Sequence, residues 1–149
     1  MKKLMMLGLF IVTAVILTGC GKEKSLTCTY TLDTNEVKGT MEYSFSFDKK
    51  GESLTKYDKK DTAEYIGDKK EEEIEEIYQS GLKACEDLKD FKGVKCDIEK
   101  ENRKIIAHVE VKLKELDSDS TDVLFTQEAE NKDYEGFKSM MEQTGFTCK

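Results

Sequence analysis

Two stretches near the start of the chain alternate strictly between apolar and polar positions. From Leu26 to Leu32 every second residue is apolar or aromatic, and the same period of two recurs from Val37 to Phe47. Strict alternation is typical of a strand with one buried face. Residues 33–36 (Asp-Thr-Asn-Glu) separate the two stretches and favour a turn. The pattern therefore predicts a β-hairpin over residues 26–47.

The next segment, residues 52–65, follows a turn at 48–51 and predicts a weaker strand. Its residues are polar on both faces, and its few apolar positions are Leu54, Tyr57 and Tyr65. Charged side chains, lysines above all, are common on edge strands because they discourage pairing with other chains. We therefore expect this strand at an edge of the sheet.

Residues 69–90 carry the clearest helical pattern in the chain. The apolar positions recur at steps of three and four residues and form one stripe: Ile74, Ile77, Tyr78, Gly81, Leu82, Cys85 and Leu88. Asp68 precedes the segment as a candidate N-cap, and residues 71–73 are three glutamates that the helix dipole favours in a first turn. The pattern predicts one long helix with a single buried face.

The second half of the chain repeats this organisation. Residues 94–98 and 105–113 alternate around a turn at 101–102, and residues 133–144 form a second amphipathic segment that ends at Gly145. The element order is strand-strand-strand-helix-strand-strand-helix. It predicts an α+β fold, a single domain over residues 26–149, in which two helices pack on one face of an antiparallel sheet.

The N-terminus has the layout of an export signal. A short basic head, Met1-Lys2-Lys3, precedes an apolar run that is too short to span a bilayer, and the run ends in Leu17-Thr18-Gly19-Cys20. Small residues before a cysteine suit cleavage and lipidation of its thiol. We therefore expect a signal peptide over residues 1–19, lipid on Cys20, and a tether over residues 20–25. Two acyl chains would hold the protein on the extracytoplasmic face of the cell membrane.

The charge of the chain narrows its partners. The formal net charge is −7, and cleavage before Cys20 would remove two lysines and no acidic residue. Nucleic-acid binding requires a basic face, so the composition argues against a nucleic-acid partner.

Four further cysteines remain after Cys20, and an exported domain favours disulfides between them. Four cysteines allow three connectivities. Cys85 lies near the end of the first predicted helix and Cys96 on the apolar face of the strand after it, whereas Cys28 lies in the first strand and Cys148 next to the C-terminus. We expect the bridges Cys85–Cys96 and Cys28–Cys148, with free buried thiols as the alternative.

Catalytic and metal-ligating motifs are weak. Asp117, Asp119, Thr121 and Glu128 have the spacing of calcium ligands in an EF-hand loop. Position six of that loop, however, is Asp122 instead of glycine, and apolar residues follow it. A solvated acidic loop is the alternative. His108, the only histidine, is expected to face solvent from a strand, and we expect no cofactor and no enzymatic activity.

The layout as a whole resembles the YehR-like family of small bacterial lipoproteins. The segments that carry the resemblance are Thr18-Gly19-Cys20, the alternating strand before Lys49-Lys50-Gly51, Tyr65-Ile66-Gly67, the long helix, Gly93-Val94, Phe137 to Met141, and Gly145-Phe146. The resemblance implies an α+β domain on a lipid tether with no established activity, so it brings no catalytic residues. The four additional cysteines depart from that family.

Together these features predict a membrane-anchored extracytoplasmic lipoprotein that acts as a non-enzymatic binding or interaction module at the cell envelope. Its expected partners are an envelope protein or a small ligand, and we expect a monomer. The alternative is an accessory protein that binds a small ligand or a metal ion, either in the acidic loop or in a pocket between sheet and helices.

Overall fold

The structure, a computed structural model, describes residues 23–116 and 132–149. The predicted signal peptide, Cys20 and the acidic loop with Asp117, Asp119, Thr121 and Glu128 lie outside the described residues. The segments from residue 26 onward that the sequence predicts as helices and strands all lie within the two described ranges.

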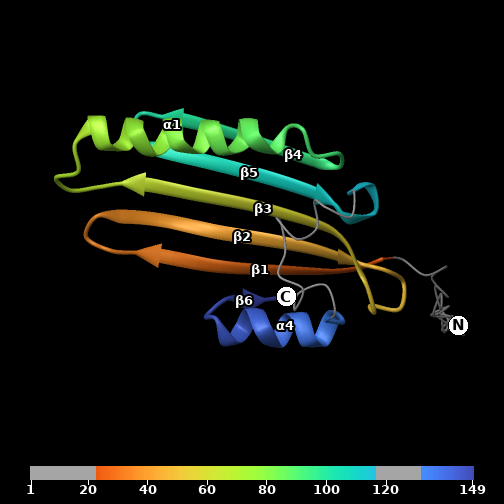
Figure 1. Cartoon of the computed structure of the whole chain (residues 1–149). Coiled ribbons are helices and arrows are strands. Elements are labelled where there is room, and N and C mark those ends of the chain that lie inside the picture. The colour runs from red at the N-terminus through yellow and green to blue at the C-terminus, as the bar shows by residue number, and fades with distance from the viewer. Residues whose placement is uncertain (1–22, 117–131) are drawn as a thin grey trace, which may run out of the picture.

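The described residues form an antiparallel sheet with helices (Figure 1). Its strands are β1 (Lys24–Asp33), β2 (Val37–Phe47), β3 (Leu54–Tyr65), β4 (Val94–Glu101), β5 (Lys104–Lys112) and β6 (Thr147–Cys148), in the spatial order β4-β5-β3-β2-β1-β6. The helices are α1 (Glu71–Leu88) and α4 (Tyr134–Gln143), with a short 3-10 turn, η1 (Leu113–Glu115), after β5. The predicted α+β fold is confirmed.

Both helices pack on the same face of the sheet, as the register of the strands shows. One row of side chains crosses the whole sheet on this face: Cys148, Cys28, Tyr43, Lys59, Val109 and Cys96. Helix α1 lies over β4 at one end of this row, and α4 lies beside β1 and β6 at the other (Figure 1). The two helices therefore cover opposite ends of one sheet face.

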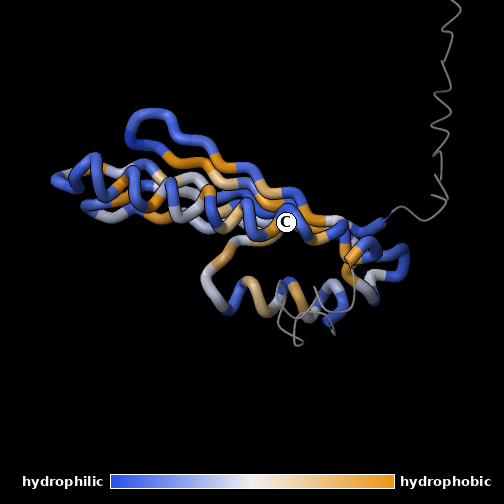
Figure 2. Tube along the Cα trace, turned by 45° about the horizontal axis from the view of Figure 1, so that its top comes forward, coloured by the Kyte–Doolittle hydropathy of each residue, from blue (hydrophilic) through white to orange (hydrophobic). Residues whose placement is uncertain are grey.

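The main core lies under α4. Its buried residues are Leu26, Cys28, Phe45, Phe47, Leu54, Phe137 and Met141. The ring of Phe137 packs against that of Phe45, with 4.4 Å between the centroids. Hydrophobic and hydrophilic positions alternate along the strands in Figure 2. The apolar positions that predicted the first hairpin thus supply the floor of the core.

Strand β3 is central and not at an edge, so the edge prediction was wrong. It pairs with β2 on one side and with β5 on the other. Its charged residues are tolerated there because they find partners: Lys59 Nζ lies 2.8 Å from Asp61 Oδ2 on the helix-bearing face, and Lys56 Nζ lies 2.6 Å from Glu110 Oε2 on the other. Paired charges can occupy the middle of a sheet where unpaired ones cannot.

The ends of the helices differ from the prediction at one point. Helix α1 is preceded by Lys70 as its N-cap, whose N–H donates to the carboxylate of Glu73 at 3.0 Å, so Asp68 is not the cap. Helix α4 has Asp133 as its N-cap, because the Asp133 carboxylate accepts from the N–H of Gly136 at 2.8 Å. Gly145 has a φ of 93° and ends α4 as expected.

The N-terminal boundary of the sheet also differs, since β1 begins at Lys24, inside the segment expected as tether. Within the part of the chain that the structure describes, no helix is long and apolar enough to cross a bilayer.

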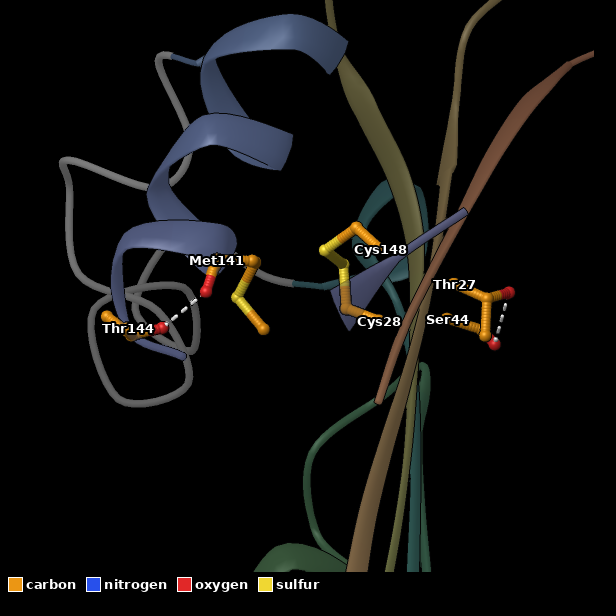
Figure 3. Close-up of a disulfide and its surroundings, with 6 residues drawn as sticks. All are labelled: Thr27, Cys28, Ser44, Met141, Thr144 and Cys148. Carbon is orange, nitrogen blue, oxygen red and sulfur yellow. Dashed lines mark hydrogen bonds between the residues drawn. A yellow bond between two sulfur atoms is a disulfide. The ribbon is translucent and has the colours of Figure 1, made fainter. Parts of the chain in front are cut away.

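Two disulfides close the fold, with the pairing that the sequence favoured. Cys28 on β1 is bonded to Cys148 on β6, and Cys85 on α1 is bonded to Cys96 on β4. Cys28 and Cys148 are cross-strand neighbours, and the Thr27 and Lys149 backbones beside them exchange hydrogen bonds of 3.0 and 2.8 Å. The bridge lies on the α4 side of the sheet (Figure 3). Each end of the cross-strand row is therefore fixed by a covalent bond.

Candidate functional site

The face of the sheet turned away from α1 and α4 is called the open face here. Its side chains come from alternate positions of β1 to β5, in register across the strands. Thr27 and Ser44 belong to it and lie on the opposite side of the sheet from the Cys28–Cys148 bridge (Figure 3). No described helix covers it, so its polar side chains are available to a ligand or partner.

The open face divides into two chemically different halves. Over β1 and β2 it presents mostly hydroxyl groups: Thr27, Thr29, Thr31, Thr40, Ser44 and Ser46. Over β3, β5 and β4 it presents mostly charged groups of both signs. Hydroxyls donate and accept hydrogen bonds without a fixed charge, so the two halves suit different contacts.

Glu110 organises part of the charged half. Its carboxylate lies 2.6 Å from Lys56 Nζ and 3.5 Å from Lys95 Nζ, which come from the neighbouring strands β3 and β4. The hydrogen bond from Lys56 holds the pKa of Glu110 below its ordinary value, and the same bond raises the pKa of Lys56. Both groups stay charged at neutral pH, and with Lys95 they link side chains of β3, β5 and β4.

A hollow of about 410 Å³ lies beside this network. Its lining consists of Lys60, Asp97, Glu99, Ile106 and His108. His108 Nε2 lies 3.1 Å from Asp58 Oδ1, and the histidine side chain is 42% exposed. His108 therefore faces solvent from the open face, as the sequence predicted.

A second hollow, of about 320 Å³, lies at the end of the open face where β1 turns into β2. Thr31, Thr40 and Thr62 form one side of it, and Lys38, Glu64 and Lys104 supply charges. Thr62 and Ile106 are direct neighbours across β3 and β5. The two hollows therefore flank a common centre on the open face.

A groove of about 450 Å³ runs between α1 and β4 at the outer margin of the sheet. The Cys85–Cys96 bridge, Leu82 and Ile98 form its inner wall. Lys83, Glu86 and Lys89 of α1 and Asp97 of β4 form its rim. This groove lies between a helix and the sheet, where the sequence analysis placed its alternative pocket.

Two glutamates in the first half of α1 form ion pairs within the protein. Glu71 pairs with Arg103, and Glu75 pairs with Lys100. The hydrogen bond from Lys100 holds the pKa of Glu75 below its ordinary value. Over residues 23–116 and 132–149, no three His, Cys, Asp or Glu side chains gather closely enough to ligate a metal ion.

Sequence reasoning missed the open face as a site because its residues are scattered over five strands. Only the strand order brings Asp97, His108 and Lys60 to one hollow. The usable signal was the polar half of each alternating pattern, which marks the solvent side of every strand. That signal identifies a face but leaves the order of its strands open.

Comparison with known proteins finds a solved structure of similar fold. The solved NMR structure of the E. coli YehR protein is similar to this chain with a TM-score of 0.50 and 13% sequence identity, over 85% of this chain and 91% of that one. No protein-family model matches the sequence, and no curated protein matches it. At this identity the similarity supports a common fold.

Proposed function

We propose that this chain is a lipid-anchored protein of the cell envelope whose extracytoplasmic domain is a non-enzymatic binding module. The uncovered open face is the observation that carries the proposal: it spans five strands and contains two hollows. The fold of YehR supports the family resemblance read from the sequence. Membership of the YehR-like lipoproteins is part of the proposal.

The position of β1 sets how far the domain could lie from an anchor at Cys20. The strand begins at Lys24, four residues after that cysteine. A fully extended chain spans about 3.3 to 3.6 Å per residue, so this link reaches roughly 14 Å. Lipid on Cys20 would therefore hold the domain close to the membrane, where it would meet envelope partners.

The anchor is tested with Cys20→Ala in a bacterial host that processes lipoproteins. The wild-type chain should enter the detergent phase in Triton X-114 partitioning, and its mass should correspond to cleavage before Cys20 plus lipid. The variant should lack both properties. A wild-type chain that remains uncleaved or unmodified would refute the anchor.

The open face is tested by site-specific photocrosslinking in intact cells. A benzophenone amino acid replaces Thr62, at the centre of the open face, or Glu72, on the exposed side of α1. Adducts should form from position 62, should be lost when Lys60→Glu is added, and should be absent from position 72. Equal adducts from both positions, or none from position 62, would contradict a binding role for this face.

A small-ligand function is the second candidate, and the hollow around His108 favours it. Carboxylates, an amine and an imidazole converge there beside the apolar Ile106, a mixture that can orient a small zwitterion. Native mass spectrometry of the full chain, released from detergent micelles, would show a retained mass. If the wild-type chain shows only its own mass, or if His108→Ala retains the same added mass, this function is excluded.

A further inference from the structure

The two edges of the sheet are finished differently. At one edge the middle of β1 is covered by β6, and Cys28–Cys148 fixes that pairing. At the other edge lies β4, and no strand of the described residues pairs with its outer side. An unpaired strand edge presents a row of backbone donors and acceptors to other chains.

The outward-facing backbone groups of β4 can be assigned. Lys112 N–H donates to the carbonyl of Gly93 at 2.8 Å, which extends the β4–β5 ladder by one pair. Alternate residues of an antiparallel strand bond to alternate sides. Asp97 and Glu99 therefore turn their backbone groups to β5, and Cys96, Ile98 and Lys100 turn theirs to the outer edge.

We propose that this free edge and the groove beside it bind an extended peptide segment of a partner protein as an added strand. The proposal deepens the binding function above and rests on it. Main-chain hydrogen bonds from the added strand would supply affinity, and the side chains on its two faces would supply specificity. The groove already exists because the disulfide fixes α1 to β4, and because Gly81 lets Ile98 pack directly against the helix.

The chemistry of the two sides defines the segment. On the open face its side chains would lie beside Asp97 and Glu99, which favours lysine or arginine. On the helix side they would meet Leu82, Ile98 and the cystine, which favours apolar residues. The expected segment alternates basic and apolar positions over roughly the length of β4.

A second copy of this chain fits the edge less well. The symmetric antiparallel pairing of β4 centred on Glu99 places acidic side chains opposite each other at Asp97, Glu99 and Glu101. Pairings centred on Asp97 or Ile98 do so at their middle, while Lys95 meets Glu99 or Glu101 at their ends. Like charges in such positions are destabilising. The same carboxylates would attract a basic segment, so charge complementarity favours a different protein as the occupant.

The test uses two fluorescent peptides and the full chain in detergent micelles. Valine alternates with lysine in one eight-residue peptide and with glutamate in the other. By fluorescence anisotropy the lysine peptide should bind at least tenfold more tightly. Asp97→Lys with Glu99→Lys should reverse this preference, whereas Glu42→Lys, on the open face but far from β4, should not. Equal binding of both peptides, or binding of neither at millimolar concentration, would overturn the proposal.

A proline isolates the backbone contribution. Lys100→Pro removes an outward N–H that the β4–β5 ladder does not use, and Lys100→Ala removes the same side chain and its ion pair with Glu75 but keeps the N–H. The proline variant should bind at least tenfold more weakly than the alanine variant, with circular dichroism confirming that both fold. Equal affinity would rule out strand addition.

Three further outcomes separate this proposal from its alternatives. Sedimentation without peptide would detect a dimer, and a dimer that Lys100→Pro abolishes would assign the edge to a second copy and overturn the proposal. Cross-linking from Thr62 without probe binding would refute the groove and leave the proposed function intact, and probe binding without that cross-link would refute the open face alone. Cys20→Ala should bind the probe as wild type does, because the groove requires no lipid.

Discussion

The two disulfides should contribute unequally to stability, and their loop lengths set the difference. Cys28 and Cys148 are 120 residues apart, and Cys85 and Cys96 are 11 apart. The loop-closure relation gives about 5 kcal/mol for the long bridge and about 3 kcal/mol for the short one. The short bridge lies within the loop that the long bridge closes, and it shortens that loop by the residues between Cys85 and Cys96. This shortening changes the stabilisation expected from the long bridge by only about 0.1 kcal/mol.

The comparison is between Cys28→Ala with Cys148→Ala and Cys85→Ala with Cys96→Ala. Packing losses should be similar, because each pair has one buried member (Cys28 at 0% and Cys85 at 6% exposure) and one half-buried member. The difference of about 2 kcal/mol therefore reports mainly on chain entropy in the unfolded state.

Urea unfolding of the full chain in detergent measures both variants. Far-UV circular dichroism and tyrosine fluorescence serve as probes, since the chain has six tyrosines and no tryptophan. A thiol assay should find no free thiol in either variant, apart from Cys20 in molecules that carry no lipid. If the short-bridge variant loses as much stability as the long-bridge variant, or more, the loop-length reasoning is refuted.

Three other substitutions test the packing of the core and the charges of the sheet. Glu110→Gln should lower the free energy of unfolding by up to about 1 kcal/mol at neutral pH. Because the pKa of Glu110 lies below its ordinary 4.5, the stabilities of wild type and variant should become equal only as the pH falls below that value, which thermal unfolding at several pH values would show. Phe137→Ala should cost about 3–5 kcal/mol in urea unfolding, since Phe137 is 2% exposed and packs from α4 against the sheet. A loss under 1 kcal/mol would contradict this packing. Gly39→Ala should cost about 1–3 kcal/mol, because its Cβ would lie 2.3 Å from the carbonyl oxygen of Thr62; an unchanged urea midpoint would contradict that close approach.

The sequence predicted the elements better than their neighbours. Alternation identified β1, β2, β4 and β5 because each has one apolar face, and that face also shows which side the helices cover. The same reasoning misplaced β3. Its charges indicated an exposed edge, yet Lys56 meets Glu110 from a strand about fifty residues later, a partner that a local pattern cannot reveal.

Short elements and capping were also beyond the pattern. β6 has two residues, too few for any periodicity, and only the bridge to Cys28 and the ladder to β1 define it. Asp68 had the right residue type for an N-cap, but the helix starts later and Glu73 satisfies the N–H of Lys70. Residue type gives a preference for such positions, and the path of the chain decides which residue occupies them.

The bridge between Cys28 and Cys148 makes almost all of the folded chain a covalently closed ring. A protease that cuts any exposed loop between these residues therefore leaves one molecule, whose halves separate only after reduction. With 24 lysine and arginine residues, the chain offers many tryptic sites. A nicked copy would keep both pieces together. Loss of material would require a reductant, or two cuts that release a piece with no bridge to the rest of the chain.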